Sequence, residues 1–202
     1  MARIGVLALQ GDVEEHRASL RRAGAEAVAV KTREQLDDLD GLVIPGGEST
    51  AVMRLLERFG LANPIVQRVR SGMPLWGTCM GMIVVAHDVA DMEQPSLDLL
   101  DVTVRRNAFG RQNESAEVDL SIPALGSKPF PAIFIRAPWI ERVGQGVELL
   151  ASRNGHGVMV RQDNVLGTSF HPELSGDPRI HAYFLAMVER ARRLSRKRST
   201  AA

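Results

Sequence analysis

The chain has one cysteine, Cys79, which lies between two glycines in the stretch GTCMG, residues 77–81. Apolar stretches flank it on both sides, so a strand is expected to enter a helix at this point. The spacing fits the nucleophile elbow, in which a tight turn holds a nucleophile at the carboxyl end of a strand. The glycines allow close packing, and the helix N-terminus behind the sulfur favours a thiolate. We therefore predict a nucleophile at Cys79; a small buried apolar residue is the alternative that this pattern leaves open.

A candidate base and a candidate carboxylate lie much later, in the stretch FHPEL, residues 170–174. Pro172 restricts His171 to an extended conformation, and residues two apart in an extended chain share a face. Glu173 is therefore expected beside the imidazole of His171. A histidine oriented by a carboxylate can activate a thiol, which is the chemistry of a cysteine hydrolase. The other histidines are interpreted as packing or surface residues: His16, His87 and His181 in expected helices and His156 in an expected hairpin turn.

Backbone N–H groups near Gly47 are candidates for stabilising negative charge. The stretch VIPGGESTA, residues 43–51, ends an expected strand with two glycines and then begins a helix that Ser49 is expected to cap. Together with the N–H of Met80, the N–H of Gly47 could hold the oxyanion that forms in acyl transfer. A simple tight loop is the alternative. The stretch lacks the Gly-Lys-Ser/Thr signature of a P-loop.

These groups need a fold that brings strand ends together. Short apolar runs predict strands at residues 4–9, 27–30, 41–45 and 74–77. Helices are expected at residues 12–23, after Ser49 and after Cys79, and Asp12 with Glu15 resembles a capping box at the first of them. This alternation of strands and helices predicts a mainly parallel central sheet with helices on both faces.

The pattern changes after about residue 99, where short β-like pieces are separated by Gly, Pro and Asn. These pieces, LLDVTV, AEVDL, AIFI, GVMV and NVLGTSF, are expected to add antiparallel strands in the C-terminal half. A last helix is expected from Asp177 and Pro178, and the basic segment at about residues 190–202 is expected to fray. The prediction is a single α/β domain over residues 1–202.

Composition limits the possible partners. Hydrophobic residues make up 45% and charged residues 24% of the 202 residues, with a net charge of +1. No strong field therefore favours a nucleic acid or a membrane, and the basic residues from Arg190 to Arg198 are interpreted as a solvated helix end. The first apolar run is too short for a membrane span or a signal peptide, and one cysteine fits a reducing compartment. We expect a cytoplasmic protein without a metal cluster, because there is no cysteine pair and the histidines lack ligand spacing.

The motifs GTCMG, PGGES and FHPEL resemble those of the class I, triad-type glutamine amidotransferases. Within that group, the chain is similar to the glutaminase subunits of pyridoxal 5'-phosphate synthase. The stretches that carry this narrower resemblance are ALQGDVEEH (8–16), PGGEST (45–50), RRNAFGRQ (105–112), FIRAP (134–138) and FHPEL (170–174). They span nearly the whole chain, and RNAFGRQ is the most specific. The chain departs from the family pattern at Ala51, Met80 and Ala116, where a threonine, a small residue and an aromatic residue are expected.

The resemblance implies a reaction: hydrolysis of L-glutamine to L-glutamate and ammonia through a thioester on Cys79. His171 would act as acid and base, and Glu173 would hold the imidazole. Gly47 and Met80 would supply the oxyanion hole, and no cofactor is implied.

The resemblance also implies binding residues and a partner. The residues implied to position glutamine are Gly47, Glu48, Ser49, Arg106, Ile135 and Arg136. The ammonia would pass to the barrel-shaped synthase subunit, and Gln10 and Gly11 would lie near the docking face.

Two other functions stay open. The first is another elbow-cysteine hydrolase, such as a γ-glutamyl hydrolase or a protease-like or chaperone-like member of the superfamily. The second is a degenerate glutaminase that only binds a partner. Loss of the triad would mark this second case, yet all three residue types are present.

Overall fold

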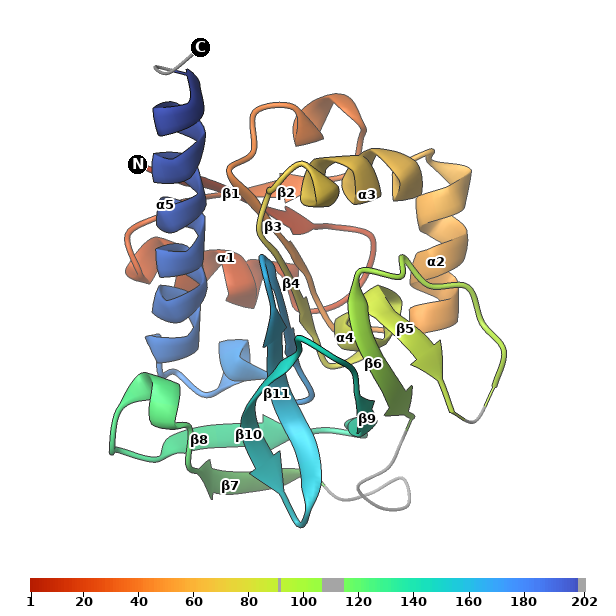
Figure 1. Cartoon of the computed structure of the whole chain (residues 1–202), viewed down its shortest axis with the longest axis vertical. Helices are drawn as coiled ribbons and strands as arrows, with labels where there is room; N and C mark the ends of the chain where they lie inside the picture. The colour runs from red at the N-terminus through yellow and green to blue at the C-terminus, as the bar shows by residue number, and fades with distance from the viewer. Residues whose placement is uncertain (91, 107–114, 200–202) are drawn as a thin grey trace.

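One large sheet forms the centre of the computed structural model, which describes residues 1–90, 92–106 and 115–199 (Figure 1). Its strands are β1 (Arg3–Leu7), β2 (Glu26–Val30), β3 (Gly41–Ile44), β4 (Leu75–Thr78), β5 (Ala86–Val89), β6 (Leu100–Arg105), β9 (Trp139–Val143), β10 (Glu148–Arg153), β11 (His156–Gln162) and β12 (Val165–Thr168). Their order is β2-β1-β3-β4-β12-β11-β9-β6-β5, with β10 paired to β11. The strands from β2 to β12 in this order are parallel, whereas β11 pairs antiparallel with β12, β9 and β10. The predicted α/β fold with a mainly parallel sheet and added antiparallel strands is confirmed.

Helices cover both faces of the sheet, as predicted. The helices are α1 (Val13–Arg22), α2 (Ser49–Arg58), α3 (Ala62–Arg70), α4 (Met80–Val85) and α5 (Arg179–Ser199). Leu20 of α1 and Phe184 of α5 belong to the same buried cluster as Trp76 of β4. Leu56 of α2 and Ile65 of α3 belong to the cluster on the opposite face. Each fully buried apolar side chain of this size contributes roughly 2 kcal/mol, so the two clusters hold the layers together.

Two predicted helix caps differ from the structure. Asp12 is the residue before α1, but its side chain makes no capping hydrogen bond, because it is directed to the imidazole of His171 instead. Helix α2 is capped by Glu48 rather than by Ser49. The Glu48 carboxylate accepts hydrogen bonds from the N–H groups of Thr50 and Ala51, at 3.2 and 2.7 Å. It thereby satisfies two donors that the first turn of a helix leaves unpaired.

The C-terminal half contains strands at all five predicted pieces and two more that the sequence patterns did not reveal, β9 and β10. The piece NVLGTSF was expected to add an antiparallel strand, but β12 pairs parallel with β4 in the middle of the sheet and is antiparallel only to β11. The pieces AEVDL and AIFI fall in β7 (Ala116–Leu120) and β8 (Phe130–Phe134), which form a separate two-stranded sheet. The β10–β11 hairpin turns at Asn154 and Gly155, which have φ of 50° and 81°. Asn-Gly is the favoured pair for such a turn. His156 is therefore the first residue of β11 rather than a turn residue.

Further differences concern single elements. Helix α3 and strand β5 were not predicted, and His87 lies in β5 rather than in a helix. Helix α5 continues to Ser199, so the basic segment from residue 190 to residue 199 is part of that helix. Among the described residues, no helix combines the length and the apolar character that crossing a membrane requires.

Candidate functional site

Four neighbouring parallel strands end at the same edge of the sheet, and each delivers part of one site. Strand β1 leads to residues 10–12, β3 to residues 45–48, β4 to Cys79 and β12 to His171. The backbone N–H of Cys79 donates to the carbonyl oxygen of Thr168 at 2.7 Å, which joins the ends of β4 and β12. Ligand sites of open α/β sheets lie outside the carboxyl ends of the strands, so this edge is where a site is expected.

The turn at Cys79 has the geometry of a nucleophile elbow. Cys79 lies between β4 and α4 with φ of 50° and ψ of −114°, a conformation that non-glycine residues rarely adopt. A Cβ on Gly77 would lie 2.4 Å from the carbonyl oxygen of Gly81, and a Cβ on Gly81 would lie 2.0 Å from that of Ile44. Both contacts are with backbone atoms, so neither position has room for a side chain. The predicted elbow is confirmed.

The predicted base and carboxylate meet at this thiol. The Nδ1 of His171 lies 2.7 Å from the Oε1 of Glu173, and the imidazole lines the same cleft as the thiol of Cys79. The Sγ of Cys79 lies 3.9 Å from the carbonyl oxygen of Ile135. The contact between His171 and Glu173 was predicted from an extended chain. It arises instead in a short 3₁₀ turn, Pro172–Leu174, that begins directly after His171. The sulfur, imidazole and carboxylate are thus brought together at one edge of the sheet.

Burial and hydrogen bonding shift the pKa of the His171 imidazole in opposite directions. Burial alone would lower the pKa of its imidazole, but the neighbouring Cys79, together with the hydrogen bond and the negative charge of Glu173, outweighs burial and raises the pKa to about 10. Burial also raises the pKa of Glu173, whose side chain is not exposed to solvent. The hydrogen bond with His171 acts against this effect of burial on Glu173, because a protonated imidazole donates to a carboxylate in a charge-assisted hydrogen bond.

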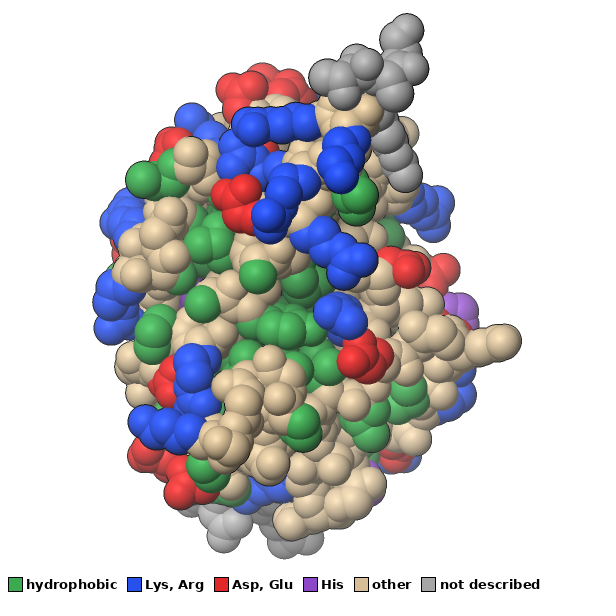
Figure 2. Space-filling view, turned by 60° about the vertical axis from the view of Figure 1, so that its left-hand side comes forward, with side chains coloured by type: hydrophobic (Ala, Val, Ile, Leu, Met, Phe, Trp, Pro, Cys, Tyr) green, Lys and Arg blue, Asp and Glu red, His purple; other side chains and the backbone are tan. Residues whose placement is uncertain are grey.

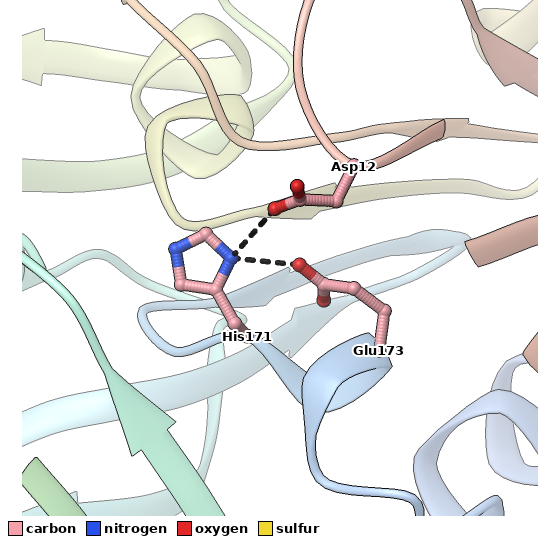
Figure 3. A group of neighbouring side chains, drawn as sticks. All are labelled: Asp12, His171 and Glu173. Carbon is pink, nitrogen blue, oxygen red and sulfur yellow. Dashed lines mark hydrogen bonds and ion pairs between the residues drawn. The ribbon is translucent and has the colours of Figure 1, made fainter. Parts of the chain in front are cut away.

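A second carboxylate faces the same imidazole. Oδ2 of Asp12 lies 3.6 Å from Nδ1 of His171, and Figure 3 shows the side chains of Asp12 and Glu173 converging on that nitrogen. One ligand atom from each of these three residues lies within 4.8 Å of the other two, which is close enough for a metal ion. The expectation of no metal considered only cysteines and histidine spacing. Because Nδ1 of His171 is already engaged by Glu173, we interpret the cluster as part of the thiol–imidazole site.

A cleft of about 510 Å³ opens at the thiol. It is lined by Gln10, Gly11, Asp12, Gly47, Glu48, Cys79, Met80, Arg106, Ile135, Arg136 and His171. Most residues that the sequence singled out are therefore brought together here. Glu173 lies behind His171, and the side chain of Ser49 is fully buried, with its hydroxyl donating to Gln94 at 3.1 Å. Neither of these two residues lines the cleft.

Two residues of opposite charge, Arg106 and Glu48, lie side by side in the lining of the cleft. Nη2 of Arg106 lies 3.4 Å from Oε1 of Glu48, and Nη1 of Arg106 lies 3.4 Å from Oε1 of Gln94. Burial would raise the pKa of Glu48, but the N–H groups of Ala51 and Thr50, together with Arg106, lower it below its ordinary value. Glu48 is thus held as a carboxylate near neutral pH. The rest of the motif RNAFGRQ, residues 107–112, lies outside the described residues.

The loop beyond β3 is packed tightly against the loop beyond β1. Gly47 has φ of 145°, and Oε1 of Gln10 accepts a hydrogen bond from the N–H of Glu48 at 3.0 Å. A Cβ on Gly11 would lie 2.0 Å from the carbonyl oxygen of Gly46. A Cβ on Gly46 would lie 2.9 Å from the imidazole of His171, so Gly11 is required by the backbone of Gly46, and Gly46 by the side chain of His171. The position of Gly46 beside the imidazole was not predicted.

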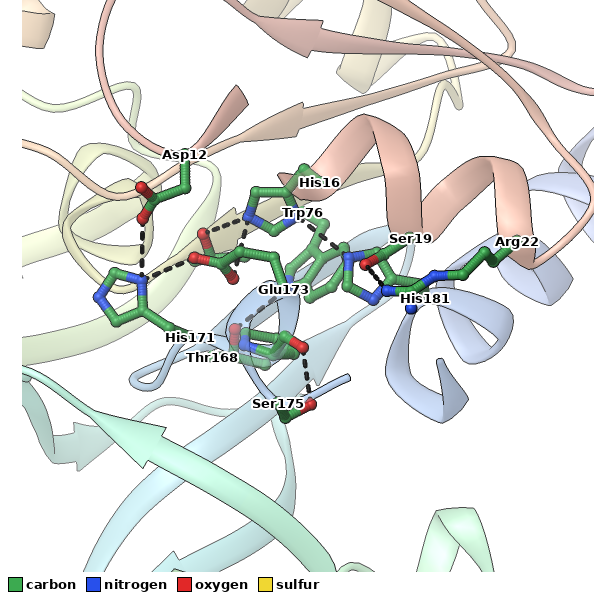
Figure 4. A network of polar contacts seen from close by, with 12 residues as sticks. Asp12, His16, Ser19, Arg22, Trp76, Thr168, His171, Glu173, Ser175 and His181 are labelled. Atoms are coloured by element: carbon green, nitrogen blue, oxygen red, sulfur yellow. Dashed lines mark hydrogen bonds and ion pairs between the residues drawn. The ribbon is translucent and has the colours of Figure 1, made fainter. Parts of the chain in front are cut away.

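A buried polar network lies behind the triad (Figure 4). His16 lies 3.2 Å from Oε2 of Glu173, and its other ring nitrogen lies 3.1 Å from His181. Sequence reasoning interpreted both histidines as packing or surface residues, because nothing in helical spacing relates residue 16 to residue 181. Their side chains are in fact fully buried. The one available signal was that His16 closes the family stretch ALQGDVEEH.

Comparisons with known proteins agree with this geometry. Residues 6–190 match the SNO glutamine amidotransferase family. The chain is 54% identical over 190 residues to the pyridoxal 5'-phosphate synthase subunit PdxT of Dehalococcoides mccartyi, covering 93% of this chain and 97% of that protein. It is 53% identical over 189 residues to the subunit of the same name from Pelotomaculum thermopropionicum, covering 94% and 96%.

A similar solved structure is a crystal structure described as a glutamine amidotransferase. It has a TM-score of 0.87 and 47% sequence identity, and the match covers 92% of this chain and 98% of that one. The predicted resemblance to triad-type glutamine amidotransferases, and within them to the glutaminase subunit of pyridoxal 5'-phosphate synthase, is thereby confirmed. On the strength of the family match and these identities over nearly the whole length, the chain belongs to the SNO glutamine amidotransferase family.

Proposed function

We propose that this chain hydrolyses L-glutamine to L-glutamate and ammonia, as the glutaminase subunit of a cytoplasmic pyridoxal 5'-phosphate synthase. The observation that carries the proposal is the grouping of Cys79, His171 and Glu173, with the thiol at an elbow and opening on a cleft. The names of the most similar relatives, pyridoxal 5'-phosphate synthase subunits, support the assignment to that pathway.

The reaction follows from the roles that this geometry allows. The thiol proton of Cys79 rests on His171 as an imidazolium, and the sulfur attacks the side-chain amide carbon of glutamine as a thiolate. The N–H groups of Gly47 and Met80 hold the oxyanion; donors of this kind are each worth roughly 3 kcal/mol. His171 then protonates the leaving ammonia, which leaves a glutamyl thioester. Water, activated by the same imidazole, attacks the thioester and releases glutamate, while Glu173 stabilises the imidazolium.

Charged residues of the cleft orient the substrate in this proposal. The guanidinium of Arg106 pairs with the α-carboxylate of glutamine, because its planar donors suit a carboxylate. Glu48 lies beside Arg106 and offers an acceptor for the α-ammonium group. Arg136, at φ of 44°, and Ile135 form the opposite wall. Ser49 acts only through its backbone, because its buried hydroxyl is engaged with Gln94.

The ammonia must leave without meeting bulk water, where it would become ammonium. Gln10 and Gly11 line the cleft beside the thiol and face the barrel-shaped synthase subunit that receives it. The identities above favour this function over the rival hydrolases, and the intact set of three groups argues against a module that only binds a partner.

The test is an ammonia-release assay on glutamine for the wild type, Cys79→Ala and Cys79→Ser, with and without the synthase subunit. Cys79→Ala is expected to lower kcat by about 1,000-fold or more, because no other thiol or hydroxyl side chain is among the described residues that line the cleft. Folate polyglutamate and peptide substrates are assayed in parallel. Equal glutamate production by Cys79→Ala and the wild type would refute the mechanism, and faster hydrolysis of either alternative substrate would refute the assignment.

A further inference from the structure

The imidazole of His16, on α1, lies directly behind the triad. Its Nε2 is 3.2 Å from Oε2 of Glu173 and 3.2 Å from Oγ1 of Thr78, and its Nδ1 is 3.1 Å from Nε2 of His181 (Figure 4). His16 and the Glu173 side chain are both completely buried. Oε2 of Glu173 has no hydrogen bond of good geometry among the described residues. The hydrogen bond recorded at Nε2 of His16 is the one with Oγ1 of Thr78, whereas the equally close Oε2 of Glu173 has none. One N–H at His16 thus has both oxygens within reach.

The chemistry of the carboxylate decides where the ring protons of this network lie. An ionised Glu173 can only accept hydrogen bonds, so Nε2 of His16 must carry the proton that faces Oε2. Nδ1 of a neutral His16 is then an acceptor, and Nε2 of His181 must donate to it. The opposite tautomer of His16 would place a lone pair against the carboxylate. Both histidines are kept neutral, since burial, followed by neighbouring positive charge, lowers the pKa of each, that of His181 to about 3.

We propose that His16 is a positioning residue: its Nε2–H holds Oε2 of Glu173, so that Oε1 stays on Nδ1 of His171 and Nε2 of His171 stays on the thiol. The contact reaches the reacting sulfur only through Glu173 and His171, and the proposal rests on the proposed glutaminase function. Outer groups that fix the orientation of an inner ligand act in the same way in metal sites, where their loss typically costs about 10- to 100-fold in activity.

A purely structural role is the competing explanation. His16 packs edge-on against Trp76, with ring centroids 5.4 Å apart, and a buried ring contributes to stability by its contacts alone. A structural histidine would be replaced equally well by any side chain of similar size. A positioning histidine requires a donor at the place of Nε2, and this difference can be measured.

Two substitutions of similar size test the roles of Nε2 and Nδ1 of His16 separately. In His16→Gln the side-chain amide reaches the place of Nε2 and can donate to Glu173. In His16→Asn the amide reaches only the place of Nδ1, so it can meet His181 but not Glu173. We expect His16→Asn to lower kcat about 10-fold or more while KM for glutamine stays within about 2-fold, and His16→Gln to keep kcat within about 3-fold of the wild type.

Melting temperatures are measured beside the kinetics, so that a loss of kcat can be distinguished from a loss of stability. Wild-type kcat in both variants, or the same loss of kcat in both, would overturn the proposal in favour of packing. Cys79→Ala, assayed in parallel, separates this result from failure of the proposed function. If Cys79→Ala retains glutaminase activity, the mechanism fails, whereas a difference between the two His16 variants concerns only the positioning role.

A measurement on the unaltered protein avoids the risk that either variant fails to fold. Nitrogen-15 NMR of histidine-labelled protein reports which ring nitrogen of each imidazole is protonated. We expect His16 as the neutral tautomer protonated at Nε2 and His181 likewise protonated at Nε2. A His16 signal from the tautomer protonated at Nδ1 would overturn the proposal, because that ring cannot donate to Glu173.

Discussion

The charge of one residue, His171, influences both the chemistry and the stability of the site. Its imidazole contacts the thiol of Cys79 and the carboxylates of Glu173 and Asp12. The hydrogen bonds and negative charges around it stabilise the protonated form more than burial destabilises it. The folded protein therefore holds a proton at this position that the unfolded chain releases near neutral pH.

The raised pKa of His171 predicts a pH-dependent stability. Its folded-state pKa of about 10 lies above the ordinary value of about 6.5, so its contribution is complete below pH 6.5 and is lost as pH rises through 10. We expect the difference in free energy of unfolding between the wild type and His171→Asn to shrink from pH 6.5 to pH 10. Urea unfolding at several pH values measures it. A difference that is constant or grows over this range would contradict the assignment.

Residue-scale prediction from the sequence succeeded where local constraints are strong. The glycines around Cys79 and the proline after His171 have direct steric consequences, so the elbow turn and the contact of His171 with Glu173 could be predicted without coordinates. Asp12 and His16 were missed as members of the site. Asp12 could satisfy a helix-capping pattern, and the environment of His16 depends on three-dimensional packing against Glu173 and α5 that no local pattern encodes.

At the scale of elements, the elbow depends on how closely α4 approaches β3. Gly81 belongs to α4, and its α-carbon lies so close to Ile44 that a Cβ would be 2.0 Å from the Ile44 carbonyl oxygen. This contact fixes the helix N-terminus behind the sulfur. Moving the helix away would change the direction of Cys79 as well as the packing of the core.

Gly81→Ala is accordingly predicted to destabilise the protein by about 3 kcal/mol, because the new methyl group meets backbone that cannot yield without moving a strand. Gly60→Ala is the control: its φ is 64° and nothing lies within 4 Å of the added Cβ, so about 1 kcal/mol of backbone strain is expected. Urea unfolding compares the two variants. Equal losses in both would show that the close approach of α4 to β3 is unimportant.

Elements were predictable where the apolar pattern was continuous. Strands β1 and β3 are buried along almost their whole length and were recognised from their apolar runs. Strands β9 and β10 were missed because they carry the half-exposed sequences WIERV and ELLASR, in which charged residues interrupt the alternation. Strand β5 was missed because AHDV continues the apolar run of α4 without a turn residue.

At the scale of the whole molecule, the cleft lies at one edge of the sheet, between the loops that follow β1, β3, β4 and β12. The exit for ammonia must lie on this side in the proposed function. Hairpin β10–β11 belongs to the antiparallel part of the sheet and contributes no residue to the cleft lining. The loops around the cleft and the β10–β11 hairpin can therefore be compared in one experiment on partner binding, with the hairpin as the control region.

Hydrogen exchange should locate the synthase subunit on the molecule. Adding that subunit is expected to slow amide exchange at residues 8–12 and 45–49, because docking there excludes solvent from the loops beside the thiol. Exchange in the hairpin at residues 148–162 is expected to be unchanged. Mass spectrometry of peptic fragments gives both values. Protection of the hairpin without protection of the loops would place the partner elsewhere.

The missing side chain at Gly11 has a mechanical consequence. Main chain rests directly on main chain where residue 11 meets Gly46, with no rotatable group between them to absorb a displacement. A displacement of the loop that contains Gly11 must therefore also displace the peptide units at Gly46, which lie beside Cys79. A partner that docks on the loop at Gly11 could therefore shift the loop at Gly46 through this direct contact, without any intervening side chain.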